Sequence, residues 1–143
     1  MILRHSYTLL EMIVVTAVIM TVLGVATINF SNLRLAKSPT ELAEDLRRMG
    51  ALCRRCAIAQ GKPQEVFYHH EKRLLKFDRE SVFLPEGTKL LVDGAEPEED
   101  IGCMKFFPDG SAAASTVEFV SGEDIVGVTV SPLTGMLKSY EKE

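Results

Sequence analysis

The feature that most constrains this chain is an uncharged apolar run from Met12 to Phe30, which only three threonines and one asparagine interrupt. As a helix rising about 1.5 Å per residue, these 19 residues would extend about 28 Å, close to the thickness of the hydrocarbon core of a bilayer. A helix of this length in a soluble core is expected to have a polar face, and this run has none. We therefore predict a membrane-spanning helix over residues 7–30.

The alternative to a span is a secretory signal that is cleaved off. Such a signal has an apolar region of about 7–15 residues and ends in a small-residue cleavage site. The run here is longer and continues into charged helical sequence, which favours a single-pass span. Basic residues flank the run on both sides, so the positive-inside rule gives little guidance. Because few residues precede it, we expect the N-terminus in the cytoplasm and the C-terminal part on the other side of the membrane.

Glu11 lies at the start of the apolar run. A carboxylate at membrane depth costs about 2.5–3.5 kcal/mol on insertion scales and is usually retained because the protein uses it. If a protease removed residues 1–6, the α-amine of Tyr7 would become the new N-terminus. In an assembly of parallel helices, Glu11 of one subunit could then pair with the Tyr7 amine of its neighbour, which would offset the cost of burying both charges. Cleavage would thereby start polymerisation.

A second helical segment follows over residues 31–61. Ser38 is a good N-cap, Pro39 suits the first helical turn, and Glu41 completes a capping box. We expect one long helix bent near Pro39, with the membrane span as its first half and an amphipathic second half that Gly61 ends. The apolar stripe at three- and four-residue spacing consists of Leu42, Leu46, Met49, Cys53, Cys56 and Gln60, and the arginines outside it, which we expect to face water, are Arg47, Arg48, Arg54 and Arg55.

The pattern changes over residues 62–143, where short strand-like pieces alternate with turn residues. Glycine and proline lie between these pieces in positions that suit tight turns. We expect about six or seven short antiparallel strands in one twisted sheet or two packed sheets, with the stripe of residues 39–60 over their apolar face. The predicted fold class is therefore α+β. The predicted strands are EVFYHH, RLLKFD, TKLLV, CMKFF, STVEFV, IVGVTV and GMLKSY.

Few residues could carry chemistry. Cys53 and Cys56 form a C-x-x-C pair, but a zinc site needs four ligands. Only Cys103 and one of the adjacent histidines, His69 and His70, could join them. We interpret the paired cysteines as small apolar residues of the helix stripe, and whether any cysteines form a disulfide stays open. No nucleophile, phosphate-binding or metalloprotease motif occurs in the sequence. We therefore expect a protein that is not an enzyme, with no cofactor, no metal and no small-molecule substrate.

The net charge of −4 makes nucleic acid an unfavourable main partner. The charges are nevertheless segregated along the chain. Residues 34–55 carry six basic and three acidic side chains, whereas residues 86–124 are mostly acidic. One interpretation is two solvated faces. The other is head-to-tail packing of copies or relatives, with the basic helix of one subunit against the acidic sheet edge of the next.

Two segments resemble a known family. Residues 7–11, Tyr-Thr-Leu-Leu-Glu, match the N-terminal signature of type IV pilins and type II secretion pseudopilins. In that signature a short basic leader and a cleavage site precede an aromatic residue, Thr-Leu, an apolar residue and a glutamate that opens a long apolar helix. Residues 104–140 are similar to the β domain of GspH/FimT-type minor pseudopilins, in which a strand runs into a Phe-x-Pro-x-Gly-like turn and a Thr-Gly hairpin closes the domain.

The resemblance implies a minor pseudopilin of a type II secretion system, a structural subunit of the periplasmic pseudopilus that drives protein export. It implies that prepilin peptidase cuts between Ser6 and Tyr7 on the cytoplasmic side, that the new Tyr7 amine is methylated, and that Glu11 serves assembly. The chain would then be a single-pass protein of the inner membrane with residues 1–6 as a leader and residues 62–143 as a periplasmic β domain. Its partners would be other major and minor pseudopilins. The family usually has glycine in place of Ser6 and phenylalanine in place of Tyr7, and because serine is small we expect slower cleavage rather than none.

Two alternatives stay open. One is a minor pilin of a type IV pilus or DNA-uptake machine, which salt-dependent binding of DNA would favour. The other is an unrelated membrane-anchored periplasmic enzyme or binding domain. That alternative predicts that Glu11→Leu leaves function intact, whereas both pilin interpretations predict loss of assembly.

Overall fold

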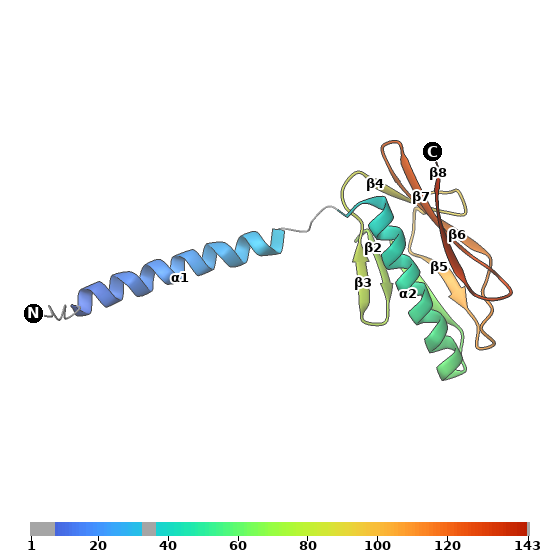
Figure 1. Cartoon of the computed structure of the whole chain (residues 1–143), viewed down its shortest axis with the longest axis horizontal. Helices are drawn as coiled ribbons and strands as arrows, with labels where there is room; N and C mark the ends of the chain where they lie inside the picture. Colours follow the sequence, from blue (N-terminus) through green and yellow to red (C-terminus); the bar gives the residue numbers. More distant parts are fainter. Residues whose placement is uncertain (1–7, 33–36, 143) are drawn as a thin grey trace, which may run out of the picture. The chain divides into compact units, whose positions relative to one another are not determined.

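The computed structural model describes residues 8–32 and 37–142, with the backbone alone for residues 22–32. The chain divides into two compact units, residues 1–35 and residues 36–143. The second unit contains a helix and all the strands of the described residues (Figure 1).

The helix of the first unit is α1 (Leu9–Asn32). It begins after Thr8, whose hydroxyl accepts a hydrogen bond from the backbone N–H of Glu11 at 3.3 Å. Further along, the Thr16 hydroxyl donates to the carbonyl oxygen four residues earlier, and the Thr21 hydroxyl does the same at 2.7 Å. These two polar side chains are therefore satisfied within the helix and need no polar partner from outside.

The sequence predicts a membrane span over residues 7–30. In the part of the chain that the structure describes, no helix is both long enough and apolar enough to cross a membrane. The predicted span is therefore not confirmed.

The single long helix expected over residues 7–61 is interrupted before its second half. The helix of the second unit, α2 (Pro39–Gln60), begins anew after Ser38, whose backbone is extended with φ −68° and ψ 157°. Proline disfavours helical geometry in the residue before it and suits the first helical position, so α2 begins at Pro39 and does not extend back through Ser38. The capping box is confirmed: Ser38 Oγ accepts from the N–H of Glu41 at 3.3 Å, and Glu41 Oε2 accepts from the N–H of Ser38 at 3.0 Å.

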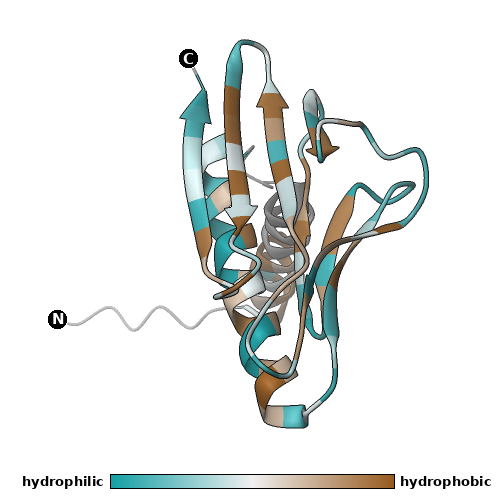
Figure 2. Ribbon diagram, turned by 90° about the vertical axis from the view of Figure 1, so that its right-hand side faces the viewer, coloured by the Kyte–Doolittle hydropathy of each residue, from teal (hydrophilic) through white to brown (hydrophobic). Residues whose placement is uncertain are grey.

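The strands form two four-stranded antiparallel sheets. The first has the order β3-β2-β1-β5 and the second β4-β6-β7-β8, and apolar and polar residues alternate along several strands (Figure 2). Of the two arrangements that the sequence predicted, one twisted sheet or two packed sheets, the structure has two sheets. The strands are β1 (Gln64–His69), β2 (Leu74–Phe77), β3 (Glu80–Phe83), β4 (Thr88–Val92), β5 (Ile101–Phe106), β6 (Ser115–Ser121), β7 (Asp124–Val130) and β8 (Leu137–Lys142).

All seven predicted strands are present among the described residues, together with an eighth, β3, which was not predicted. Strand β3 has four residues and pairs with β2 across a two-residue turn, Asp78 and Arg79. Asp78 takes φ 51° there, a left-handed conformation that aspartate tolerates. Because the turn contains neither glycine nor proline, the sequence carries no strong hairpin signal at this point.

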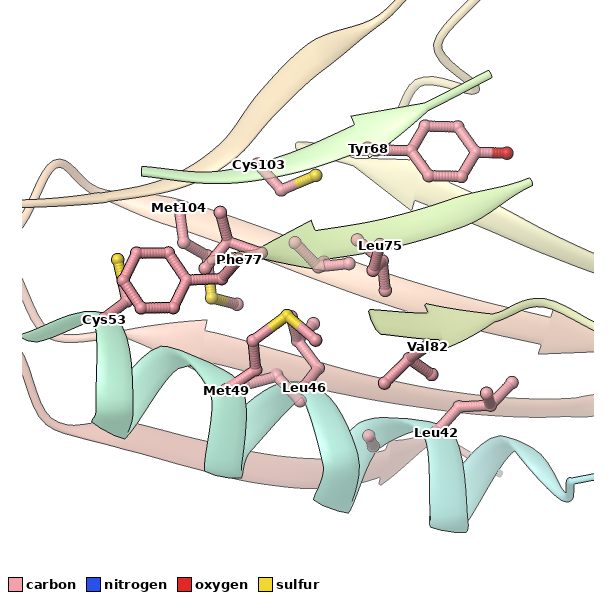
Figure 3. Packing of buried hydrophobic residues seen from close by; sticks show 14 of the residues in the cluster. Leu42, Leu46, Met49, Cys53, Tyr68, Leu75, Phe77, Val82, Cys103 and Met104 are labelled. Atoms are coloured by element: carbon pink, nitrogen blue, oxygen red, sulfur yellow. The ribbon is translucent and has the colours of Figure 1, made fainter. Parts of the chain in front are cut away.

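The helix α2 contacts strands of both sheets, so its buried side is part of the common core (Figure 3). Gln60 does not belong to that side, because it is exposed. Ala57, four residues after Cys53, takes the last buried position instead, as the 3.6-residue period requires. The residues of the predicted stripe that are fully buried, or nearly so, are Leu42, Leu46, Met49 and Cys53.

Candidate assembly site

The structure describes the predicted assembly residue but not the predicted processing residues. Ser6 and Tyr7 lie outside the described residues, so the cleavage and methylation sites stay predictions. Glu11 is described: it is exposed and is the third residue of α1, directly after the Thr8 cap. The structure therefore places the carboxylate at the N-terminal end of a helix.

That position favours a negative charge, because the unpaired N–H groups of a first turn carry partial positive charge. The gain is about 0.3–1 kcal/mol at a surface. Placing a carboxylate at membrane depth costs about 2.5–3.5 kcal/mol. If Glu11 lay at that depth, the helix end would leave roughly 2 kcal/mol of the cost uncompensated.

Large apolar side chains surround Glu11 and continue along α1. Each of them has between 49% and 80% of its surface exposed. Because they occur on every side of the helix, burial against one sheet face could not cover them all. The apolar surface of α1 in the described residues therefore extends around the helix. The side chains are Leu9, Leu10, Met12, Ile13, Val14, Val15, Val18, Ile19 and Met20.

In the second unit, Arg54 joins the two turns that resemble the GspH/FimT β domain. Its Nε donates to the carbonyl oxygen of Gly110, in the turn after β5, at 3.0 Å. A Cβ atom on Gly135, in the turn before β8, would lie 2.4 Å from that same carbonyl oxygen and 2.8 Å from Arg54 Nε. The two turns also contact each other directly, because the N–H of Ala112 donates to the carbonyl of Pro132 at 2.9 Å. These contacts form what we call the Arg54 junction: Arg54, Gly110 and Gly135.

The prediction that Arg54 faces water is wrong. Its side chain is partly buried because two glycines leave room for the guanidinium between the turns. The helix pattern could not reveal this, since Arg54 lies outside the apolar stripe. The signal in the sequence was the glycine in each turn: Gly110 has φ 86° and Gly135 has φ 60°, conformations that other residues rarely adopt.

The adjacent histidines take part in a loop contact that the sequence did not predict. Nδ1 of His69 lies 2.8 Å from Oδ2 of Asp100, and the backbone N–H of His70 donates to Oδ1 of the same carboxylate at 2.8 Å. The hydrogen bond with His69, followed by that with His70, lowers the pKa of Asp100. The ring of His70 meets the edge of Tyr68. Asp100 therefore ties the connection between β4 and β5 to the end of β1.

All three cysteines are free. Cys53 and Cys103 are buried, and this burial raises the pKa of each thiol to about 12, so neither is a thiolate near neutral pH. Cys56 is half-buried and packs against the core, as expected for a residue of the stripe. In the part of the chain that the structure describes, no group of three or more histidine, cysteine or acidic side chains could hold a metal ion.

Comparison with known proteins bears on the fold. No family model and no curated protein matches the sequence. The structure is similar to that of the minor pseudopilin EpsH from the Type 2 Secretion System of Vibrio cholerae, with a TM-score of 0.57. The chain has a pseudopilin-like fold. The match covers 73% of this chain and 98% of the EpsH chain at 17% sequence identity.

At 17% identity the likeness shows the fold alone. It supports the pilin-like fold that the resemblance implied but does not test the GspH/FimT type, which rested on a turn and a hairpin. In this chain the turn and the hairpin meet at Arg54.

Proposed function

We propose that this chain is a structural subunit of a pilin-like assembly, namely a minor pseudopilin of the GspH/FimT type in a type II secretion system, and not an enzyme. The observation that carries the proposal is the fold that the chain shares with EpsH. The exposed apolar side chains of α1 around Glu11 support it, because a helix that is apolar on every side needs partners on every side.

In this proposal, prepilin peptidase cuts between Ser6 and Tyr7, and the new amine is methylated. The mature chain then carries a cation four residues before Glu11. When α1 enters a parallel bundle of other pseudopilins in the inner membrane, Glu11 pairs with the Tyr7 amine of a neighbour and the β domain lies in the periplasm. The pairing fixes the register, because an unpaired carboxylate in the bundle would keep most of its burial cost.

The first test is the intact mass of the protein from cells with and without prepilin peptidase. We expect the loss of residues 1–6 and the gain of one methyl group only when the peptidase is present. An unchanged mass in both strains would leave Glu11 without the proposed partner and would contradict the proposal.

A second test addresses Glu11 in cells that contain the other pilin-like subunits. Glu11→Leu and Glu11→Gln should both abolish co-isolation with those subunits, while the peptidase still removes residues 1–6. The matched control is Glu86→Gln, which removes an exposed carboxylate from the second unit and should leave co-isolation intact. Normal assembly of the Glu11 variants would favour a membrane-anchored domain of another class.

A further inference from the structure

The solvent-facing side of α2 lies between two grooves. One runs between α2 and β3 and is lined by Arg48, Leu52 and Arg55, among others. The other runs between α2 and the start of β8 and is lined by Arg55 and Met136, among others. Ala51 and Arg55 line both grooves, so the two grooves are neighbours on this side of α2. We call Arg48, Ala51, Leu52, Arg55 and Met136 the α2 outer surface.

This surface combines positive charge with exposed apolar groups, and the groove beside β3 is also lined by Asp45 and Glu80. Arg55 is exposed and has no acidic partner among the described residues. Arg48 reaches Asp45 only at 3.9 Å, and Asp45 also binds Lys37. Leu52 is 37% exposed and Met136 is 61% exposed. Arginine and methionine are enriched where proteins bind other proteins, so the combination favours a protein partner.

A complementary segment exists in the same chain, in the connection between β4 and β5. We call residues 96–100 the acidic segment. Lys89 pairs with Glu96 at 3.1 Å, and the two histidines hold Asp100. Glu98 and Glu99 are exposed, and within the described ranges neither has a basic partner. The segment therefore presents two unpaired carboxylates.

The two surfaces do not meet within one chain. The two histidines hold the acidic segment at the end of β1, and no residue of this segment lines either groove beside α2. Among the described residues, neither Glu98 nor Glu99 forms an ion pair with Arg48 or Arg55. Charges of opposite sign thus occupy separate places on one domain, which is the condition for a head-to-tail contact between identical subunits.

We propose that the acidic segment of one copy docks on the α2 outer surface of a second copy, with Glu98 and Glu99 against Arg48 and Arg55. This inference rests on the proposed function, because a head-to-tail contact does not close on itself and can repeat along a filament. Exposed ion pairs are individually weak. The contact is therefore expected to form where α1 helices already hold the copies at high local concentration.

The test is charge reversal in the full chain in detergent, with sedimentation velocity as the readout at low and high salt. Arg48→Glu/Arg55→Glu makes both surfaces of a chain acidic, and Glu98→Lys/Glu99→Lys makes both basic. Each variant alone should associate at least about tenfold more weakly than the unchanged chain. An equimolar mixture of the two should associate again, because each acidic surface then meets a basic one.

The matched controls are Lys142→Glu and Glu123→Lys, which reverse exposed charges outside both surfaces and should change nothing. The proposal is overturned if the unchanged chain does not self-associate, if single reversal has no effect, or if mixing does not restore association. It is also overturned if Arg48→Glu/Arg55→Glu loses only binding to a 20-base-pair DNA duplex, because the surface would then serve nucleic acid.

The experiments distinguish failure of this contact from failure of the proposed function. If Glu11→Leu abolishes co-isolation while the reversals leave self-association unchanged, the pilin-like role stands and this contact is wrong. If the reversals behave as expected but the peptidase has no effect on mass, the contact stands and the proposed role is wrong.

Discussion

The Arg54 junction makes a sharp prediction about Gly135. Replacing this glycine by alanine adds one methyl group at a position with φ 60°, and the new Cβ would lie 2.4 Å from the carbonyl oxygen of Gly110. Real Cβ atoms essentially never come that close to another atom. The obstructing atom belongs to the backbone of a turn that is held by backbone hydrogen bonds, from Gly110 N–H to the Phe107 carbonyl and from Ala112 N–H to the Pro132 carbonyl, so it cannot move aside cheaply.

Two separate terms make up the expected loss of stability. An alanine in the left-handed region costs about 1–2 kcal/mol. Forcing an extra carbon into a filled site costs about 1–3 kcal/mol more, as in overpacked cores. We therefore expect Gly135→Ala to lower the free energy of unfolding by about 2–5 kcal/mol in total.

The chain supplies matched controls for the first term. Gly122 has φ 63° in the turn between β6 and β7, and Gly61 has φ 63° at the end of α2. A Cβ atom at either position would meet nothing within 4 Å. Gly122→Ala and Gly61→Ala should therefore cost only the conformational term, about 1–2 kcal/mol.

The assay is urea unfolding of residues 36–143, the compact unit that contains its own core, followed by far-ultraviolet circular dichroism. The difference between Gly135→Ala and Gly122→Ala isolates the steric term and should be at least about 1 kcal/mol. Adding Arg54→Ala should not rescue Gly135→Ala, because the Gly110 carbonyl still obstructs the methyl group. Equal losses for the two glycine variants would refute this account of the junction.

Other perturbations have equally definite outcomes. Leu46→Ala removes a completely buried side chain and should cost about 2–5 kcal/mol in the same urea assay, whereas Leu52→Ala, at a site 37% exposed, should cost about 1 kcal/mol or less. A thiol reagent at pH 8 should modify Cys56 first in the folded protein, as mass spectrometry would detect. Cys53 and Cys103 should react only after unfolding, because burial raises their pKa to about 12. Rapid labelling of all three cysteines would contradict the burial of Cys53 and Cys103. Burial and the hydrogen bond to Glu118 raise the pKa of Tyr140 to about 12 from its usual value of 10.0. The folded chain therefore holds this proton more tightly, so the stability it contributes is present below about pH 10 and is lost as the pH rises towards about 12. Tyr140→Phe should make the decline of unfolding free energy over that range shallower, and an identical decline in both proteins would exclude Tyr140 as its source.

Much of the second unit was predictable from local pattern. The Ser38–Glu41 capping box and the stripe led by Leu42 and Leu46 were read correctly, because capping and helical periodicity depend only on residues three or four positions apart. Strand β3 was missed because its turn at Asp78 adopts a left-handed backbone without a glycine to signal it. Of the residues predicted for processing and assembly, the structure describes Glu11 but not Ser6 or Tyr7.

The sequence by itself determined the α+β class, the start of α2, seven of the strands and the position of Glu11 at the head of an apolar helix. These follow from residue type, period and turn chemistry, which act over short distances along the chain. Only the tertiary structure decided that the strands form two sheets, that Arg54 joins two turns more than 50 positions away, and that Asp100 binds His69. Such contacts depend on how distant segments fold together, and a side chain's spacing along a helix does not reveal a glycine in another turn that makes room for it.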